Sequence, residues 1–148
     1  MTMSNADLKV PQGELVSLEL HDARLSGLAL EAHSGKCVVS FAHLAGFHER
    51  DPDVRYDVWS YRAELSLEGI DSIVLTGGPL ESRGYVNTGS IIAAGKESEL
   101  LAALGGLRGG LRVEFGFFNG AELRIGAEDG RLELVEAPEF LQEWCPPR

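Results

Sequence analysis

Apolar and polar residues alternate with a period of two along most of this chain, which is the pattern of a β-strand that buries one face. The alternation predicts strands over residues 14–20, 23–31, 36–44, 54–67 and 71–78. Turn-forming residues separate these runs, for example AHSG between the second and the third. The chain is therefore predicted to consist mainly of strands.

The apolar phase changes within the run VRYDVWSYRAELSL (54–67). Tyr56 and Val58 fall on one face, and from Trp59 onward the apolar residues fall on the other. Such a change is typical of a β-bulge or of a bend between two sheets. We therefore expect an irregularity between Val58 and Trp59.

The C-terminal third predicts strands over 111–117, 121–127 and 131–136, joined by the turn sequences FNG and EDG. Both turns are strong hairpin signals, so we expect a three-stranded antiparallel meander with one apolar face. Charges of both signs alternate on its polar face, which predicts cross-strand ion pairs among Arg112, Glu114, Glu122, Arg124, Arg131 and Glu133.

Two segments favour helices. Residues 96–105 combine acids in a first turn with Leu100, Leu101 and Leu104 at helical spacing, and glycines follow. Residues 138–144, PEFLQEW, predict a short C-terminal helix held by its apolar side chains.

With 148 residues, 44% of them apolar and 24% charged, the composition is that of one globular domain. We expect a single mostly β (α+β) domain over 1–148, in which residues 1–13 are a loosely ordered N-terminal segment. Its architecture is predicted to be an antiparallel sheet or a two-sheet sandwich-like domain with one main helix near 96–105 and a short C-terminal helix.

The chain is acidic: 13 Lys and Arg against 23 Asp and Glu give a net charge of −10. Such a surface repels nucleic acid and speeds encounter with basic partners. No apolar run approaches the roughly 20 residues of a membrane span, and the first residues do not have the pattern of a signal peptide. Cys37 and Cys145 are too few for a disulfide framework. We expect a cytoplasmic protein that contacts neither nucleic acid nor membrane.

The run LELHDARLSGLALE (18–31) breaks its alternation at His21 and Asp22. A histidine beside a carboxylate is compatible with half of a catalytic relay, but the sequence identifies no third residue. At a strand junction, an Asp side chain commonly caps backbone N–H groups instead. We interpret Leu20, His21 and Asp22 as a structural motif that joins the first two strands.

No motif indicates an enzyme or a cofactor. The chain has no G-x-S-x-G elbow, and its glycine pairs match neither a P-loop nor G-x-G-x-x-G. His43 continues the apolar face of the strand 36–44, which predicts a partly buried core histidine, and His48 falls in a predicted loop. These two residues with Glu49 and Asp51 match no standard metal-ligand spacing. We therefore expect no catalysis, metal or cofactor.

The unbalanced acids are concentrated in two segments. HERDPDVRYD (48–57) carries four acids and two arginines, and ELVEAPEFLQE (133–143) carries four glutamates and no cation. Each is either an ordinary solvated surface or part of a patch that docks a basic protein. In the second case the charge would steer association and set specificity more than affinity.

The segments LHDARLSGLALE, CVVSF, VWSYRAELSLEGIDSI and GLRVEFGFFNGAELRIGAEDGRLELV resemble a group of small bacterial proteins. These open with a Leu-His-Asp-Ala/Ser signature and continue as a β-rich domain, and some are immunity proteins that neutralise polymorphic or contact-dependent toxins. The resemblance covers most of residues 15–136, and the signature falls on Leu20, His21, Asp22 and Ala23. The insert HLAGFHERDPDVRYDV departs from the shared pattern.

The resemblance implies a non-catalytic immunity protein that inhibits a basic, nuclease-type toxin through its acidic surface. The charge excess predicts a contact set of Phe47, Glu49, Asp51, Asp53, Tyr56, Asp57, Glu136, Glu139, Glu143 and Trp144. Two alternatives stay open. One is a housekeeping protein-binding module, and the other is a small-molecule binder or enzyme with His21 or His43 in a pocket between sheet and helix.

Overall fold

The computed structural model describes residues 10–51, 55–79 and 84–144, and most of them are in strands, as the alternation predicted. The strands are β1 (Leu15–Glu31), β2 (Lys36–Asp51), β3 (Arg55–Glu68), β4 (Ser72–Thr76), β5 (Val86–Ala93), β6 (Lys96–Ser98), β7 (Leu111–Phe117), β8 (Glu122–Ala127), β9 (Asp129–Leu134) and β10 (Glu139–Trp144). A 3-10 helix, η2 (Leu100–Gly105), connects β6 to β7.

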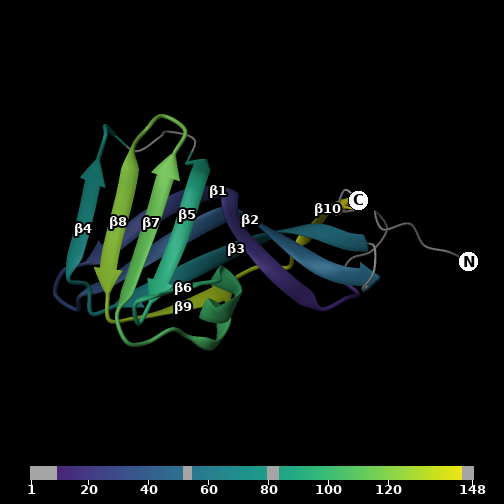
Figure 1. Cartoon of the computed structure of the whole chain (residues 1–148), viewed down its shortest axis with the longest axis horizontal. Helices are drawn as coiled ribbons and strands as arrows, with labels where there is room; N and C mark the ends of the chain where they lie inside the picture. Colours follow the sequence, from purple (N-terminus) through teal and green to yellow (C-terminus); the bar gives the residue numbers. More distant parts are fainter. Residues whose placement is uncertain (1–9, 52–54, 80–83, 145–148) are drawn as a thin grey trace, which may run out of the picture.

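The strands form two antiparallel sheets. Sheet A has the order β1-β2-β3-β10, with β9 also paired to β3, and sheet B has the order β4-β8-β7-β5-β6. Figure 1 shows that the strands of sheet B cross those of sheet A steeply and cover only one half of that sheet. We call the other half the distal end of sheet A: residues 44–51 of β2, residues 55–61 of β3, and β10, with residues 15–19 of β1 paired to β2 beside them.

The main core lies between the sheets, where alternate residues of each strand point inward. Val39 stands opposite Leu65 in the β2–β3 pair, and both side chains are almost fully buried. Phe41 of sheet A meets Phe115 of sheet B edge to face, with ring centroids 6.0 Å apart. Burying each such side chain stabilises the fold by about 1.5–3 kcal/mol, so this alternation holds the two sheets together.

The predicted meander is wrong in its third strand. β7 and β8 form the expected hairpin, but β8 has β4, not β9, as its other neighbour. β9 crosses to sheet A and pairs with β3, where Asp129 stands opposite Glu68. The Glu128 N–H donates a hydrogen bond to the Glu68 carbonyl at 2.9 Å, so the EDG segment directs the chain toward β3.

The main helix predicted near 96–105 is also wrong. Ala94 and Gly95 have φ angles of 50° and 80°, and this tight turn folds Lys96–Ser98 back onto β5 as the strand β6. The helical spacing of the leucines survives only in η2, which buries Leu100 and Ala103. Backbone pairing with β5 therefore overrides the local helix propensity of the first residues.

The C-terminal helix predicted at 138–144 is the strand β10. Phe140 stands opposite Trp59 of β3, and their rings meet edge to face at 5.4 Å. A helix of so few residues is marginal by itself, because few of its backbone groups find partners. Pairing with β3 satisfies those groups and buries the Phe140 ring at the same time.

The irregularity expected between Val58 and Trp59 lies in the neighbouring strand. Phe140 stands opposite Trp59 and Gln142 opposite Val58, so the extra residue is Leu141 of β10. The apolar phase changes within β3 because both of its faces carry apolar side chains here. Trp59 belongs to the main core, whereas Val58 is buried outside it.

Candidate functional site

The two acidic segments, far apart in the sequence, lie side by side at the distal end of sheet A. β10 pairs with the first residues of β3, so that Glu139 stands opposite Ser60 and Glu143 opposite Asp57. On the other side of β3, Glu49 of β2 stands opposite Tyr56. Residues that face each other across antiparallel strands project from the same face of the sheet, so this register assigns every side chain to a face.

The face turned away from the main core carries three cross-strand rows. We call it the outer distal face, and its described side chains on β2, β3 and β10 are Ala45, Phe47, Glu49, Tyr56, Val58, Ser60, Glu139 and Gln142. On β1, Ser17 stands opposite Phe47 and Glu19 opposite Ala45. The inner distal face carries Gly46, His48, Asp57, Trp59, Phe140 and Glu143.

The centre of the outer distal face is apolar. The rings of Phe47 and Tyr56 meet edge to face with centroids 6.4 Å apart, and both side chains are half-buried. Val58 stands opposite Phe47 and is only 4% exposed, although it does not belong to the main core cluster. Its burial therefore comes from neighbours on the outer distal face, which presents an aromatic cluster partly open to solvent.

Acidic side chains border this aromatic cluster. Glu139 is exposed and Glu49 is half-buried. Glu136, just before β10, is 60% exposed and forms an ion pair with Arg62 Nη1 at 3.6 Å. Because that pair is exposed, it contributes little to stability and leaves the carboxylate reachable by another cation. An apolar centre inside a charged, solvated border is the usual anatomy of a protein-binding surface.

The structure thus brings together part of the predicted contact set. The residues that share the outer distal face or its border are Phe47, Glu49, Tyr56, Glu136 and Glu139. The side chains of Asp51 and Trp144, and all of Asp53, lie outside the described residues.

Asp57 is wrong as a surface contact. It lies between Tyr56 and Val58 on β3, so its side chain takes the opposite face, and it is only 3% exposed. Glu143 stands opposite Asp57 and shares the inner distal face, although it is exposed at the edge of the sheet. Charge counting along the sequence could not separate these acids from Glu49 and Glu139, because the separation depends on strand register.

His48 was predicted to lie in a loop but belongs to β2. It is 6% exposed and lies on the inner distal face, opposite the aromatic cluster. Its Nδ1–H donates a hydrogen bond to the Gly13 carbonyl at 2.8 Å. In the neutral ring with this Nδ1–H, Nε2 accepts a hydrogen bond from the Tyr61 hydroxyl. Burial raises the pKa of Tyr61 to about 12, so this phenol remains a donor at neutral pH.

Gly46 allows Tyr61 to lie flat against β2. A Cβ at Gly46 would lie 2.5 Å from Tyr61 Cε2, and Tyr61 is held in place by its bond to His48. We expect Gly46→Ala to lower the free energy of unfolding by about 1–3 kcal/mol through overpacking. Chemical denaturation measures this change, with Gly105→Ala as the matched control, because a Cβ at Gly105 meets nothing within 4 Å. Equal stability of the two variants would contradict this packing.

His21 and Asp22 do not join two separate strands, because β1 runs through them from Leu15 to Glu31. Asp22 has φ of 64°, and the pairing of β1 with β2 shifts register between Glu19 and Arg24. The motif is therefore a bulge within one bent strand. Within the described residues no backbone N–H is seen to be capped by Asp22, and its carboxylate lies 3.5 Å from His21 Nε2.

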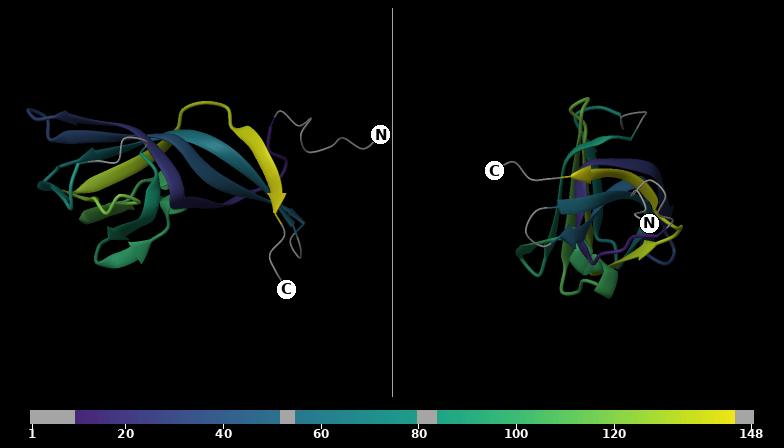
Figure 2. Two further views of the ribbon diagram at one scale, coloured as in Figure 1. Left: turned by 90° about the horizontal axis from the view of Figure 1, so that it is seen from above. Right: turned by 90° about the vertical axis from the view of Figure 1, so that its right-hand side faces the viewer.

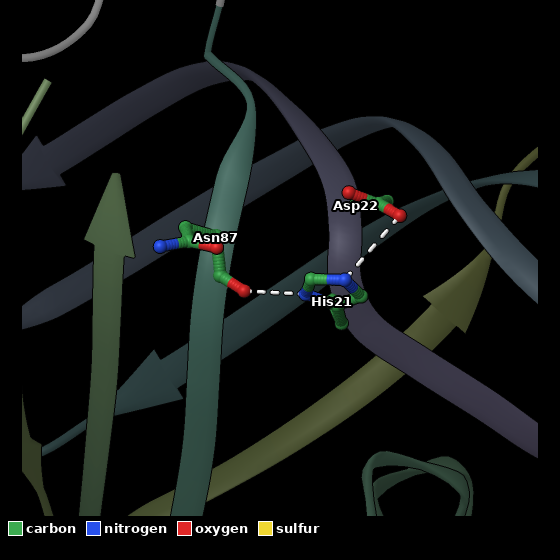
Figure 3. A network of polar contacts seen from close by, with 3 residues as sticks. All are labelled: His21, Asp22 and Asn87. Atoms are coloured by element: carbon green, nitrogen blue, oxygen red, sulfur yellow. Dashed lines mark hydrogen bonds and ion pairs between the residues drawn. The ribbon is translucent and has the colours of Figure 1, made fainter. Parts of the chain in front are cut away.

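Figure 3 shows what the motif does. The His21 Nδ1–H donates to the Asn87 carbonyl at 2.5 Å, which ties β1 of sheet A to β5 of sheet B. His21 and Asp22 are both exposed, at 65% and 67%. No hydroxyl or thiol side chain in the described part of the chain hydrogen-bonds to His21. The geometry favours the structural interpretation of this pair over a relay.

A different histidine has a serine partner. His43 Nδ1 and Ser60 Oγ are 2.6 Å apart, on the outer side of sheet A. His43 does not continue the core face as predicted, because the register of β2 shifts between Phe41 and Leu44 and places Leu44 in the core instead. Sequence spacing gave no signal for this pair, since it depends on that shift and on the pairing of β2 with β3.

Partial burial lowers the pKa of His43, and the negative charge of Asp22 raises it in opposition. We expect Asp22→Asn to lower the pKa of His43 further, as followed by NMR titration of the imidazole. In the unfolded chain the pKa is near 6.5, so the folded state binds fewer protons below that pH. The contribution of neutral His43 to the free energy of unfolding is therefore fully present above pH 6.5 and is lost as the pH falls through the folded pKa.

We expect Asp22→Asn to enlarge this loss of stability at low pH. His43→Gln is the control, because it removes the titrating group. A raised His43 pKa in Asp22→Asn would contradict this assignment.

No group of three or more His, Cys, Asp or Glu side chains converges as a metal site in the described ranges. Four surface hollows have volumes of 140, 330, 160 and 550 Å³, and no histidine lines any of these four. The pocket with His21 or His43 that the small-molecule alternative requires is thus not among them. No described helix is long and apolar enough to cross a membrane.

No family model, curated protein or solved structure matches this chain. A functional assignment therefore has to be based on the geometry of the outer distal face and its neighbours.

Proposed function

We propose that this chain is a non-catalytic immunity protein that binds a basic bacterial toxin through the outer distal face of sheet A. The observation that carries the proposal is the aromatic cluster of Phe47 and Tyr56 with acids from two distant segments around it. Half-buried aromatic side chains are the residue type that most often dominates binding energy at protein interfaces. The acids then select a basic partner.

The charge of the chain supports a partner of the nuclease class. A nuclease binds phosphates and so presents a basic cleft, and a chain with a net charge of −10 is attracted to it over several ångströms. Glu49 and Glu139 on either side of the aromatic cluster would occupy positions that phosphates otherwise take. Inhibition is then stoichiometric and takes place in the cytoplasm, where such a toxin acts.

One observation favours a second candidate, a hydrolytic enzyme. Ser60 is hydrogen-bonded to His43, whose pKa responds to Asp22, so a nucleophile, a base and a carboxylate lie near one another. None of these residues lines any of the four hollows. A housekeeping protein-binding module is the other alternative, and it would use the same outer distal face.

Capture from the native host separates these functions. The tagged full-length chain is incubated with cytoplasm, washed at low and at high salt, and the retained proteins are identified by mass spectrometry. We expect one basic protein, retained stoichiometrically and weakened by salt, because screening reduces attraction between exposed charges. Retention of housekeeping proteins alone would favour the binding module. An empty column, together with labelling of Ser60 by a fluorophosphonate, would favour the hydrolase.

A further inference from the structure

The sandwich is open along one side, far from the outer distal face. Leu28 and Leu30 of β1 are 37% and 53% exposed, and Leu75 of β4 is 44% exposed. These side chains point toward the layer between the sheets, because their cross-strand partners are buried core residues: Val39, Cys37 and Leu123. Three inward-facing leucines are thus left partly in water, where sheet A and sheet B do not cover each other.

A strand edge that has no partner strand among the described residues lies at the same place. The Leu25 N–H donates to the Gly84 carbonyl at 2.8 Å, and beyond it β1 pairs only with β2 among the described strands. From Gly27 to Glu31 this pairing has no irregularity. β4 is likewise the edge of sheet B. Figure 2 shows the β1–β2 hairpin and β4 at the same end of the molecule, with β10 near the opposite end.

Although β1 is irregular between Arg24 and Gly27, this edge lacks the charges and prolines by which proteins often prevent strand pairing. Residues 25–30 (LSGLAL) and 72–76 (SIVLT) contain no charged residue and no proline. Natural edge strands are usually blocked by lysine, proline or an added bulge, since an open edge offers free N–H and C=O groups to another chain. An uncharged strip this exposed and apolar is the kind of surface that marks an interaction site.

We propose that the occupant of this edge is a second copy of the same chain, with residues 26–30 of β1 pairing antiparallel to residues 26–30 of the copy, so that Leu28 stands opposite Leu28 of the copy. The charge argues for a copy over a basic partner. Two chains of net charge −10 repel each other least where they meet along a neutral strip, whereas a basic protein gains no charge attraction there. Antiparallel pairing about a two-fold axis is also self-complementary, so it closes at a dimer. Leu28 and Leu30 of both copies then cover each other.

The dimer leaves the outer distal face free, so its test is independent of the proposed toxin binding. Sedimentation velocity of the full chain is measured from low to high micromolar concentration for the wild type and for Leu28→Glu/Leu30→Glu. We expect a wild-type dimer whose dissociation constant rises by at least about 100-fold in the variant, because each copy loses two buried leucines and gains two like charges. Val135→Glu is the matched control, since Val135 is also 44% exposed but lies outside this edge.

Hydrogen exchange of the wild type keeps the proposal testable if the double variant does not fold. The amides within residues 26–30 that point to the open edge should become protected as the concentration rises, whereas those of the outer distal face should not change. A wild type that is monomeric at every concentration overturns the proposal. So does a dimer that Leu28→Glu/Leu30→Glu leaves intact, or one in which residues 26–30 exchange as fast as in the monomer.

Discussion

Replacing Trp59 with alanine is expected to lower the free energy of unfolding by about 3–5 kcal/mol, the usual cost of deleting a fully buried tryptophan side chain. Trp59 is 1% exposed and packs between the His48 ring, 6.4 Å away, and the Phe140 ring, 5.4 Å away. Its loss opens a cavity and removes the main side-chain anchor of β10 against β3. Denaturant unfolding followed by circular dichroism measures the change.

Trp59→Phe is the matched variant. It keeps an aromatic ring against Phe140 and removes the indole Nε1, which is buried and has no hydrogen-bond partner within the described residues. An unpaired buried donor costs stability, so the loss of this N–H offsets part of the lost volume. We expect Trp59→Phe to retain most of the wild-type stability. A Trp59→Ala chain that loses less than about 1 kcal/mol would show that β10 is not held by this packing.

Charge reversal on the outer distal face is expected to slow binding of the basic partner by about 10- to 100-fold at low salt. Glu49→Lys and Glu139→Lys together place two cations beside the Phe47 and Tyr56 rings, where the proposal puts the basic cleft of the toxin. Because both carboxylates lie at the solvated edge of the aromatic cluster, the effect falls mainly on the association rate. Surface plasmon resonance with the captured partner separates this rate from dissociation.

The control must change the net charge equally. Glu97→Lys with Glu128→Lys does so at exposed positions outside the outer distal face. If steering by total charge were sufficient, both double variants would bind equally slowly. The proposal requires the control pair to remain close to the wild type. It also requires the difference between the two pairs to shrink as salt is raised, because screening removes the contribution of exposed charges.

Strand periodicity is the part of the fold that the sequence predicts well. The alternating runs around Val39, Leu65 and Val113 are strands with the predicted inward faces, because a period of two has one structural meaning when one face is buried. The helices at 96–105 and 138–144 were wrong for a related reason. In short segments, leucines at helical spacing are also compatible with a 3-10 turn or with a strand, and non-local pairing with β5 and β3 decided between these outcomes.

The candidate site was predictable only in part. Counting charges found the two acidic segments, but not that β10 pairs with β3 beside β2, which is a contact between distant residues. Asp57 and Glu49 look equivalent in sequence, yet register buries the first and places the second beside Tyr56. The bond of His43 to Ser60 needs the same long-range information, since the shift between Phe41 and Leu44 turns His43 outward.

Growth rescue tests the central claim most directly, namely that the outer distal face neutralises a toxin. The captured basic partner is expressed alone in a susceptible host, then together with the wild-type chain, with Glu49→Lys/Glu139→Lys, and with Glu97→Lys/Glu128→Lys at matched levels. The account predicts arrest by the partner alone, full growth with the wild type and with the control pair, and arrest with the reversed outer distal face. A partner that does not inhibit growth, or rescue by Glu49→Lys/Glu139→Lys equal to the wild type, would contradict it.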